Sequence, residues 1–472
     1  MINYGKIKKM YFGMPKPVRK ALSVFTRFIP VQYMYGKRFR KFYKKSLETE
    51  HYTREQIEER QNKLLRKLIK HSYDNVPYYT KLFKKLNLKP RDIKTKEDLK
   101  KLPILTKEDI RNNFSKLTAR NYKDFMPDLA HTTGSTAKKL HLYLDQQNRE
   151  KEFALAYRQL RMFGIGFNAK TANFRGDFAP MIGHKYKKTH EYFPLRKELI
   201  FSSYDMTEKK IDEYIKELKK FKPELIKGFP SALYIISQHI LKKNLDVPQA
   251  KVIMTSSEIL NDEYRETIER AFKTKVFDWY GASEYVISAG QCENLKGYMF
   301  NEDFGIVEIL DEKNNPVHPG ESGRIIGTGL YNYSMPLLRY DLEDVARLSE
   351  KKCSCKRNFL HAERIEGRVQ DIIYLSENKK LPSVGIMTFW KKNVLPQTNP
   401  IEFTQVIQKD MKRFEIKVMV KDPSAKKNVV EVIDKELRKI IGNDAKIDFT
   451  FIDDFPSKEK WRFTKNEMMQ HA

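Results

Sequence analysis

Residues 129–144, LAHTTGSTAKKLHLYL, place a cluster of hydroxyl side chains directly before a short alternating segment. The alternation of residues 140–144 (LHLYL) predicts a strand with one buried face. Residues 131–136 (HTTGST) therefore lie on a loop that leads into this strand. Such a loop is either a polar turn or a cradle for phosphate oxygens, because glycine allows a close backbone approach and hydroxyls hydrogen-bond an anion. It is not a Walker P-loop, since the G-x-x-x-x-G-K-[ST] spacing is absent.

The composition indicates a folded protein of two or three domains. The chain has 472 residues, of which 40% are hydrophobic and 12% aromatic, so a disordered chain is excluded. It contains no uninterrupted apolar run of about 18 residues, and we expect neither a transmembrane span nor a signal peptide. All three cysteines lie in the second half, which argues against a disulfide framework and for a reducing, cytoplasmic compartment.

The charge is strongly basic and unevenly distributed. Ninety Lys and Arg against 61 Asp and Glu give a net charge of +29, and residues 1–45 hold 13 basic and no acidic residues. Aromatic and aliphatic side chains separate these cations. This segment either lies on an anionic membrane surface, where each cation contributes about 1 kcal/mol, or is a solvated basic face. Nucleic acid is not an expected partner, because no nucleic-acid-binding motif follows.

The pattern along the chain predicts an α/β fold. Residues 53–72 have helical spacing, with Thr53 as the N-cap and Gln56 in the position of a capping box. Between residues 150 and 300, helical segments alternate with the short apolar segments 224–229, 250–256 and 275–281, which predicts a mostly parallel sheet. Residues 304–348 indicate an antiparallel meander. The pattern after Asp371 predicts a small α+β unit.

Seven short motifs occur in order along nearly the whole chain. They are TTGST (132–136), KGFPSALY (227–234), TSSEIL (255–260), DWYGASEY (278–285), MPLLRYDLEDVARL (335–348), RIEGRVQDII (364–373) and DFPSKEKWRF (454–463). Each is weak alone. Their order resembles the adenylate-forming ligase superfamily, and more closely its phenylacetate–CoA ligase/CapK-like branch, whose members often serve polysaccharide biosynthesis.

The resemblance implies an activity and a domain organisation. In that family a carboxylic acid attacks the α-phosphorus of ATP to give an acyl-adenylate and pyrophosphate, and a thiol, usually that of coenzyme A, then displaces AMP. The implied fold has a basic N-terminal arm (1–50), a large adenylation domain of mixed sheets flanked by helices (51–369), and a small mobile α+β lid domain (370–472). The lid rotates between the two half-reactions.

The resemblance also assigns residues to the ATP site. The grip on the outer phosphates falls to Thr132, Thr133, Gly134, Ser135 and Thr136. Glu284 takes the magnesium position, because a carboxylate anchors a hard cation that bridges phosphate oxygens. The nucleotide is further lined by Ser257, Glu258, Tyr280, Gly281 and Ser283. The Ala-Lys-Lys that ends the phosphate loop replaces the Gly-x-Pro common in relatives.

Asp344 matches the family aspartate that accepts hydrogen bonds from both ribose hydroxyls. Its neighbours depart from the family pattern. Where relatives read Arg-Tyr-Arg-Thr-Gly-Asp, residues 339–344 read RYDLED. This change removes a glycine and adds two acids next to the expected ribose site, so the local geometry is open.

The C-terminal motifs supply a hinge and a catalytic lysine. Arg368 and Asp371 match the family hinge, and Arg368 is also expected at the nucleotide and in catalysis. Lys460 lies where the family has the lysine that bridges the acyl and phosphate oxygens as a mobile charge. Lys458 is a rival two residues away.

Two further groups of residues complete the expectations. The acyl pocket is assigned to Arg175, Phe229 and Pro230, with Arg175 serving either the substrate or the structure. Relatives hold a structural zinc with a Cys, His, Cys-x-Cys set. Here Cys292, Cys353 and Cys355 match, but Met299 occupies the histidine position, so a zinc site needs His361 or another fourth ligand.

Several alternatives stay open at this stage. The acceptor is coenzyme A, another thiol or an amine. A degenerate member that binds nucleotide without turnover, acting as a membrane-peripheral assembly protein, is also consistent with the altered residues 341–343.

Overall fold

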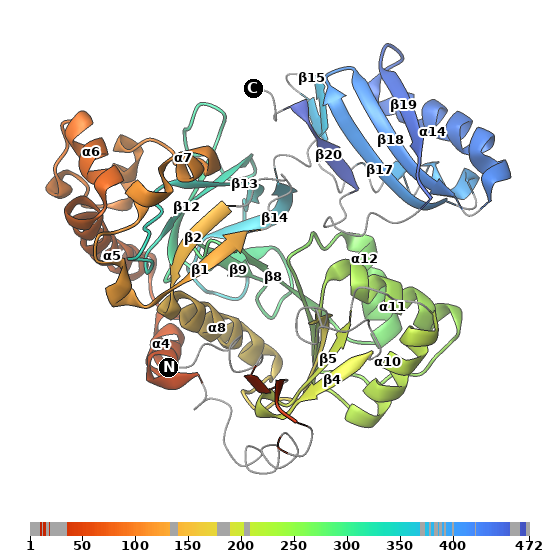
Figure 1. Cartoon of the computed structure of the whole chain (residues 1–472), viewed down its shortest axis with the longest axis horizontal. Helices are drawn as coiled ribbons and strands as arrows, with labels where there is room; N and C mark the ends of the chain where they lie inside the picture. The colour runs from red at the N-terminus through yellow and green to blue at the C-terminus, as the bar shows by residue number, and fades with distance from the viewer. Residues whose placement is uncertain are drawn as a thin grey trace.

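The computed structural model describes residues 10–11, 13–15, 18, 35–132, 140–176, 189–202, 208–368, 373–376, 379–381, 386, 389–390, 393–398, 401–420, 422–453 and 463–468. In these residues a 12-stranded mixed sheet dominates, with the strand order β11-β12-β13-β14-β10-β9-β8-β7-β6-β3-β5-β4. A four-stranded sheet and two hairpins accompany it. Figure 1 shows the large sheet flanked by helices and the four-stranded sheet to one side. The predicted α/β class is confirmed.

The N-terminal part is helical, and two of its helices begin at capping boxes. The helices are α4 (Gly36–Thr49), α5 (Arg54–Asn75), α6 (Pro77–Lys85) and α7 (Lys107–Leu117), with short 3-10 turns η1 (Pro90–Asp92), η2 (Lys96–Lys101) and η3 (Tyr122–Phe125). Thr53 and Thr106 both form complete capping boxes. Helix α4 falls within the predicted N-terminal arm, yet its Phe39 and Phe42 are buried in the main core. The division of the chain at residues 50 and 369 stays a prediction.

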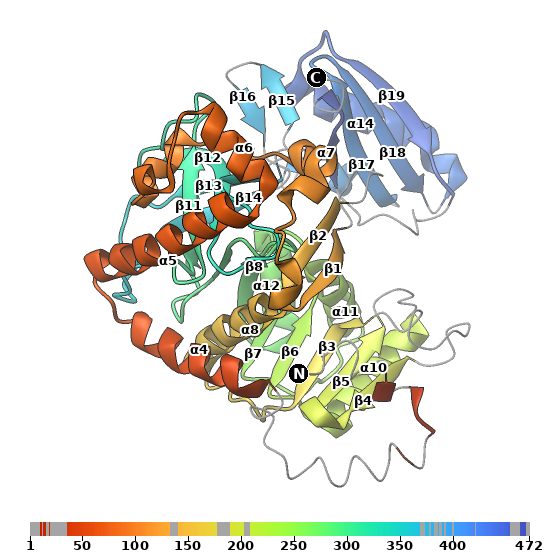
Figure 2. The same cartoon turned by 60° about the vertical axis from the view of Figure 1, so that its left-hand side comes forward.

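One half of the large sheet is parallel, as the helix–strand alternation predicts. Its strands are β3 (Thr171–Gly176), β5 (Glu198–Ser202), β6 (Leu225–Gly228), β7 (Val252–Ser256) and β8 (Val276–Gly281). Helices α10 (Glu208–Phe221), α11 (Pro230–Lys242) and α12 (Asp262–Phe272) cover one face, and α8 (Gln146–Leu160) covers the other (Figure 2). Successive residues of β6 point to opposite faces of the sheet and are buried in two different cores. Leu225 packs in the core on the α8 side, and Ile226 packs in the core on the side of α10–α12.

The other half of the sheet is antiparallel. It contains β9 (Ser288–Gly290), β10 (Tyr298–Phe300), β11 (Gly305–Leu310), β12 (Ser322–Gly329), β13 (Tyr340–Leu348) and β14 (His361–Arg368), while β4 (His190–Phe193) closes the opposite edge. The predicted meander is confirmed in β11, β12 and β13. A separate hairpin of β1 (Pro127–Thr132) and β2 (Leu140–Asp145) holds the strand predicted at residues 140–144. Leu140, Leu142 and Leu144 are buried, as the alternation predicts.

The C-terminal part forms its own core. The four-stranded sheet contains β17 (Ile401–Asp410), β18 (Arg413–Val420), β19 (Lys446–Phe451) and β20 (Thr464–Asn466), accompanied by α14 (Lys426–Ile441) and by the hairpin of β15 (Ile373–Ser376) and β16 (Lys379–Leu381). Trp390, Ile416 and Ile433 are buried together in this core. The α+β character predicted for the tail is confirmed.

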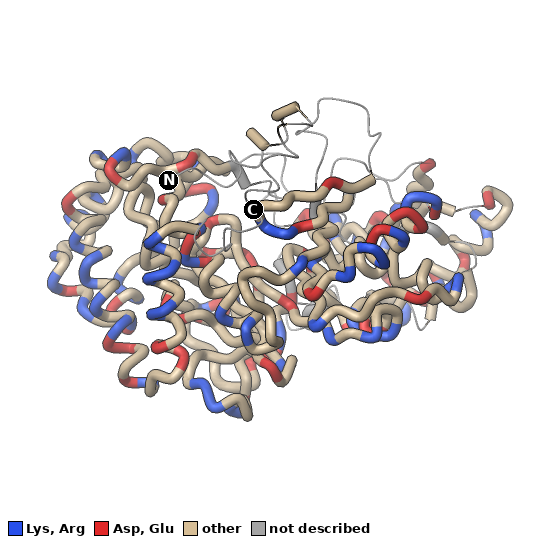
Figure 3. The backbone as a smooth tube through the Cα atoms, turned by 90° about the horizontal axis from the view of Figure 1, so that it is seen from below, with Lys and Arg blue, Asp and Glu red and all other residues tan. Residues whose placement is uncertain are grey.

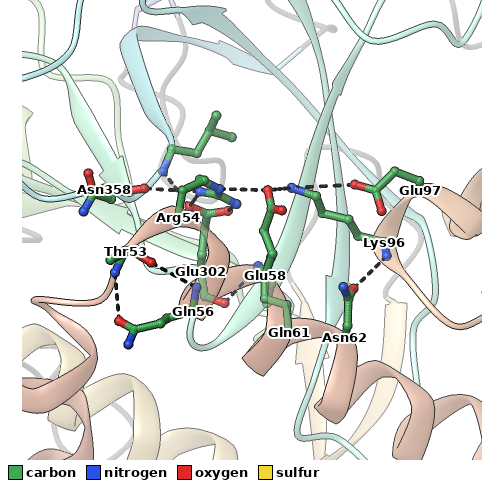
Figure 4. Close-up of polar contacts among 12 residues, drawn as sticks. Thr53, Arg54, Gln56, Glu58, Gln61, Asn62, Lys96, Glu97, Glu302 and Asn358 are labelled. Atoms are coloured by element: carbon green, nitrogen blue, oxygen red, sulfur yellow. Dashed lines mark hydrogen bonds and ion pairs between the residues drawn. The ribbon is translucent and has the colours of Figure 1, made fainter.

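Polar contacts join the N-terminal helices to the antiparallel half of the sheet (Figure 4). Arg54 of α5 forms a bidentate pair with Glu302, at 2.5 and 2.7 Å, in the loop after β10. Lys96 bonds Glu58 at 2.7 Å within the helical part itself. The helices are thus attached to the sheet by a bidentate charged contact as well as by apolar packing.

A buried ion pair lies deeper in the same junction. Arg158 of α8 is 0% exposed and pairs at 3.0 Å with Asp303, which is 3% exposed as a residue. Arg158 also donates to Asn301 at 2.5 Å and to the Ser46 carbonyl at 3.1 Å, and Thr49 donates to Asp303 at 2.8 Å. Helices α4 and α8 and the loop after β10 therefore share one buried charge network.

Charged residues are spread over the whole described chain rather than gathered on one element. Figure 3 shows Lys and Arg interspersed with Asp and Glu along the tube. None of the described helices is both long and apolar enough to cross a bilayer.

We predict that Asp303→Ala lowers the free energy of unfolding by about 3–5 kcal/mol, because Arg158 is left as a buried charge without its carboxylate partner. Urea unfolding followed by intrinsic fluorescence measures the change. Lys220→Ala, which breaks the exposed Lys220–Glu217 pair, is the matched control and costs about 0–1 kcal/mol. A midpoint shift for Asp303→Ala no larger than that of the control contradicts the prediction.

Candidate active site

Two carboxylates that the sequence assigns to ATP are held by a pair of crossed hydrogen bonds. Tyr280, on β8, donates to Asp344 Oδ2 at 2.6 Å, and Asp344 lies on β13. Tyr340, on β13, donates to Glu284 Oε1 at 2.8 Å, and Glu284 lies just after β8. The two strands are not neighbours in the sheet, so these tyrosines fix their relative position.

Burial strengthens these contacts. Tyr340 is 0% exposed and Glu284 is 9% exposed. The Tyr340 hydroxyl orients the Glu284 carboxylate through Oε1, and the other carboxylate oxygen is a ligand type that a hard cation prefers. The arrangement therefore suits a hard metal ion brought in by a phosphate ligand.

The two additional acids next to Asp344 are engaged elsewhere. Asp341 pairs with Arg324 at 2.5 Å, and its other oxygen accepts a hydrogen bond at 2.8 Å from the backbone N–H of Glu343. Glu343 pairs with Lys107, the first residue of α7. Neither acid is left uncompensated beside Asp344, which answers the question raised by the RYDLED sequence.

The start of β13 is clamped by the segment before α7. Leu105 donates its N–H to the Arg339 carbonyl at 2.9 Å and accepts from the Asp341 N–H at 2.9 Å. The buried Arg339 guanidinium bonds Glu308 at 2.9 and 3.1 Å and the Leu102 carbonyl at 2.8 Å. Sequence reasoning missed these contacts, because they join residues that are 31 positions apart for Glu308 and more than 200 apart for Leu102 and Leu105.

The β1–β2 hairpin is fastened to the loop that leads into β13. Asp145, at the end of β2, accepts hydrogen bonds from the N–H groups of Tyr333 and Ser334 at 2.8 and 3.0 Å. Its own N–H donates to Asn332 Oδ1 at 2.9 Å. Burial raises the pKa of Asp145, while these hydrogen bonds oppose the shift. The strand after the predicted phosphate loop is thus tied to the strand that carries Asp344.

The TSSEIL and YGASE segments lie at adjacent strand ends, because β7 pairs with β8. Thr255 of β7 donates to Asp278 of β8 at 2.5 Å, and Tyr298 donates to the same carboxylate at 2.6 Å. Burial raises the pKa of Asp278. Beyond these strands, Ser257 is exposed with a φ of +73°, and Glu258 is half-buried.

Gly281 lies close to two neighbouring side chains. A β-carbon there would lie 2.9 Å from Glu152 Oε1 of α8 and 3.2 Å from the Trp279 indole nitrogen. Gly281 and Ser283 are both exposed, and Tyr280 is half-buried. The YGASE segment therefore presents an open backbone surface beside Glu284.

The residues predicted for the acyl pocket meet at the ends of β3 and β6. Phe229 is the N-cap of α11 and Pro230 its first residue. Arg175 lies on β3, whose neighbour Phe174 pairs with Gly228 at the end of β6. The side chain of Arg175 is outside the described residues.

Several predicted site residues lie at or beyond the edge of what the structure describes. Thr132 ends β1, and Arg368 ends β14 directly opposite Asp344 in the strand register. The residues outside the description are Thr133, Gly134, Ser135, Thr136, Asp371, Lys458 and Lys460. Their predicted roles stay predictions.

The three cysteines gather in one cluster. The sulfur atoms of Cys292, Cys353 and Cys355 all lie within 4.8 Å of one another, and those of Cys292 and Cys353 are 3.5 Å apart. A hydrogen bond from Cys292 lowers the pKa of the Cys355 thiol, and His361 acts in the same direction. The Nε2 atom of His361 is buried without a hydrogen-bond partner among the described residues. In the register, His361 pairs with Met299.

Comparison with known proteins supports the same interpretation. The CapK C-terminal domain family matches residues 373–467. Protein CapK of Staphylococcus aureus is 26% identical over 441 residues, covering 91% of this chain and 95% of that protein. Phenylacetate–coenzyme A ligase of Pseudomonas putida is 26% identical over 327 residues, covering 68% of this chain and 72% of that protein.

The fold has a counterpart among solved structures. The 2-hydroxyisobutyryl-CoA ligase in its postadenylation state superposes with a TM-score of 0.67 at 14% identity, covering 89% of this chain and 92% of that one. The resemblance stated from the motifs is confirmed. The chain is a homologue of CapK and of the phenylacetate–coenzyme A ligases, and it has the fold of the adenylate-forming ligases.

Proposed function

We propose that this protein activates a carboxylic acid with ATP and transfers the acyl group to a thiol, coenzyme A in the first instance. The phenylacetate–CoA ligase homologues support an AMP-forming acid–CoA ligase. The observation that carries the proposal is the crossed pair of hydrogen bonds, Tyr280–Asp344 and Tyr340–Glu284, which brings two ATP-site carboxylates together. We further propose that the reaction serves polysaccharide or cell-envelope biosynthesis, and the similarity to CapK supports this role.

Each carboxylate has a distinct task in this proposal. Glu284 takes the cation of MgATP, and its orientation is set by Tyr340 before the nucleotide arrives. Asp344 accepts the ribose hydroxyls, with Arg368 across the strand register beside it. Thr132, Thr133, Gly134, Ser135 and Thr136 receive the outer phosphates. Pyrophosphate then leaves as the acid oxygen bonds the α-phosphorus.

The C-terminal residues complete the reaction. Lys460, carried by the lid domain of residues 370–472, bridges the acyl and phosphate oxygens in the adenylation step. Asp371 is the hinge on which the lid turns before the thiol displaces AMP. Phe229, Pro230 and Arg175 bound the acyl group at the ends of β6 and β3.

We also propose a structural zinc ion held by Cys292, Cys353, Cys355 and His361. Three gathered thiols are ligands that zinc favours, and a histidine nitrogen is a common fourth ligand. The pairing of His361 with Met299 supports His361 as the fourth ligand, since it lies across from the position where relatives have the histidine. The ion would cross-link the β9–β10 loop to the loop before β14 and take no part in catalysis.

Finally, we propose that residues 1–45 hold the protein on anionic membrane surfaces. The support is the sequence itself, with 13 basic and no acidic residues interleaved with aromatic ones.

We predict acid-dependent ATP–pyrophosphate exchange by the full-length chain. Lys460→Ala should lower the exchange rate by about 10²–10³-fold, because the charge that bridges the reacting oxygens is lost. Asp344→Ala should chiefly raise the KM for ATP. Lys458→Ala, two residues away, is the matched control and should keep most of the rate. Clear ATP binding with no exchange across a broad panel of acids contradicts the enzyme proposal.

We predict about one zinc ion per chain after purification from zinc-supplemented medium, measured by elemental analysis. Cys353→Ser and His361→Ala should each lower the zinc content and the melting temperature. Asn294→Ala changes a neighbour that only bonds Cys353 and Ser354, and should keep the ion. Metal-free protein with an unchanged melting temperature in chelator rules out the site.

We predict that the protein co-sediments with phosphatidylserine vesicles at low salt and less at high salt, because salt screens the cations. Deleting residues 1–34, which removes seven of the 13 cations and ends before α4 begins, should weaken this binding. Phosphatidylcholine vesicles are the control. Unchanged binding after the deletion ends the proposal for the arm.

A further inference from the structure

Within β13, the segment before Asp344 makes a local turn where the pairing with β12 shifts register. Its backbone conformation favours glycine, but it holds a glutamate. Glu343 has a φ of +59°, in the left-handed region where a β-carbon is disfavoured. The family frame Arg-Tyr-Arg-Thr-Gly-Asp has its glycine at this position. The chain therefore adopts a left-handed residue here without the glycine that makes it easy, and other contacts must stabilise it.

Three side-chain contacts hold the turn instead. Asp341 Oδ1 accepts the N–H of Glu343 at 2.8 Å, the side-chain-to-backbone bond of an Asx-turn. Arg324 fixes Asp341 from the other side at 2.5 Å. Lys107 pairs with the Glu343 carboxylate, and its side chain is only 12% exposed.

The position of Lys107 has an electrostatic cost that suggests a specific role. It is the first residue of α7, where the helix dipole disfavours a cation. The helix start is rigid, because Thr106 forms a complete capping box and Leu105 is hydrogen-bonded to β13 on both sides. Lys107 thus reaches Glu343 from a fixed support that is already attached to the same strand.

We propose that Lys107 is a positioning residue for the ribose-binding carboxylate, acting through Glu343. Glu343 immediately precedes Asp344, so the φ of Glu343 sets the direction from which Asp344 reaches the nucleotide. The ion pair between Lys107 and Glu343 stabilises a positive φ that glycine would adopt without such help. This inference rests on the proposed function of Asp344 and adds a residue that no motif marks.

The experiment is a double-mutant cycle in the full-length protein, read by calorimetric titration with magnesium and two nucleotides. The variants are Lys107→Ala, Glu343→Gly and the double variant Lys107→Ala/Glu343→Gly. The probes are ATP and 2′,3′-dideoxyATP, which lacks both hydroxyls that Asp344 would bind. Lys96→Ala, which removes the Lys96–Glu58 pair from the same helical region, is the matched control. Lys107→Arg tests rescue by a conserved charge.

Lys107→Ala should raise the Kd for ATP about five- to tenfold and the Kd for 2′,3′-dideoxyATP less than about twofold. Glu343→Gly should bind ATP within about twofold of wild type, because glycine accepts the turn without the ion pair. In the Gly background, Lys107→Ala should have no further effect. Lys107→Arg should bind like wild type, and Lys96→Ala should leave both affinities unchanged.

Two results overturn the inference while leaving the proposed function intact. One is an equal loss for both nucleotides in Lys107→Ala, which marks a general structural role. The other is a Lys107→Ala effect that persists in the Gly background. If wild type does not distinguish ATP from 2′,3′-dideoxyATP, or Asp344→Ala binds ATP normally, the ribose role of Asp344 itself fails, and the inference fails with it.

Discussion

The candidate site depends on the crossed hydrogen bonds between β8 and β13. Three strands of the sheet, β14, β10 and β9, separate these two strands in the pairing order, so backbone pairing alone does not set their distance. Tyr280 and Tyr340 set this distance. Tyr280 on β8 donates to Asp344 on β13, and Tyr340 on β13 donates to Glu284 just after β8. A buried hydroxyl–carboxylate bond is directional and short, and two of them oppose both sliding and rotation. The two hydrogen bonds therefore hold Asp344 and Glu284 at a fixed spacing across the sheet.

This constraint explains why the surrounding scaffold is so heavily bonded. Arg339 ties β13 to β11 and to the segment before α7, and Arg158 ties α8 to α4 and to the loop after β10. Both guanidiniums are almost fully buried, where an unpaired charge would be costly. Their carboxylate partners come from distant parts of the chain. Correct assembly of the helical part is therefore linked to correct placement of the strands that carry the site.

Much of the fold follows from local sequence. The capping boxes at Thr53 and Thr106, the apolar periodicity of the helices and the alternation in residues 140–144 are local signals, and the structure has the expected elements there. The parallel half follows from regular helix–strand alternation. The order of strands across the sheet does not, since it depends on long-range packing that no window of sequence contains. Glu284 and Asp344 were identifiable only because their motifs resemble a known family.

The residues that hold the site were not predictable in this way. Lys107, Arg324 and Tyr340 sit in ordinary sequence contexts, and their partners lie between 17 and 236 positions away. The altered residues 341–343 suggested a damaged ribose site when taken alone. In the structure the acids at 341 and 343 have cationic partners, and these contacts stabilise the local turn before Asp344. A departure from a motif can therefore be compensated by residues outside it.

The attachment of Asp145 to residues 333 and 334 means that two parts of the candidate site are joined before any ligand binds. Strand β2 and the loop that leads into β13 are fastened through the buried carboxylate of Asp145. A ligand that contacts both elements therefore meets a frame whose two ends are already spaced, and little ordering entropy is spent on bringing them together.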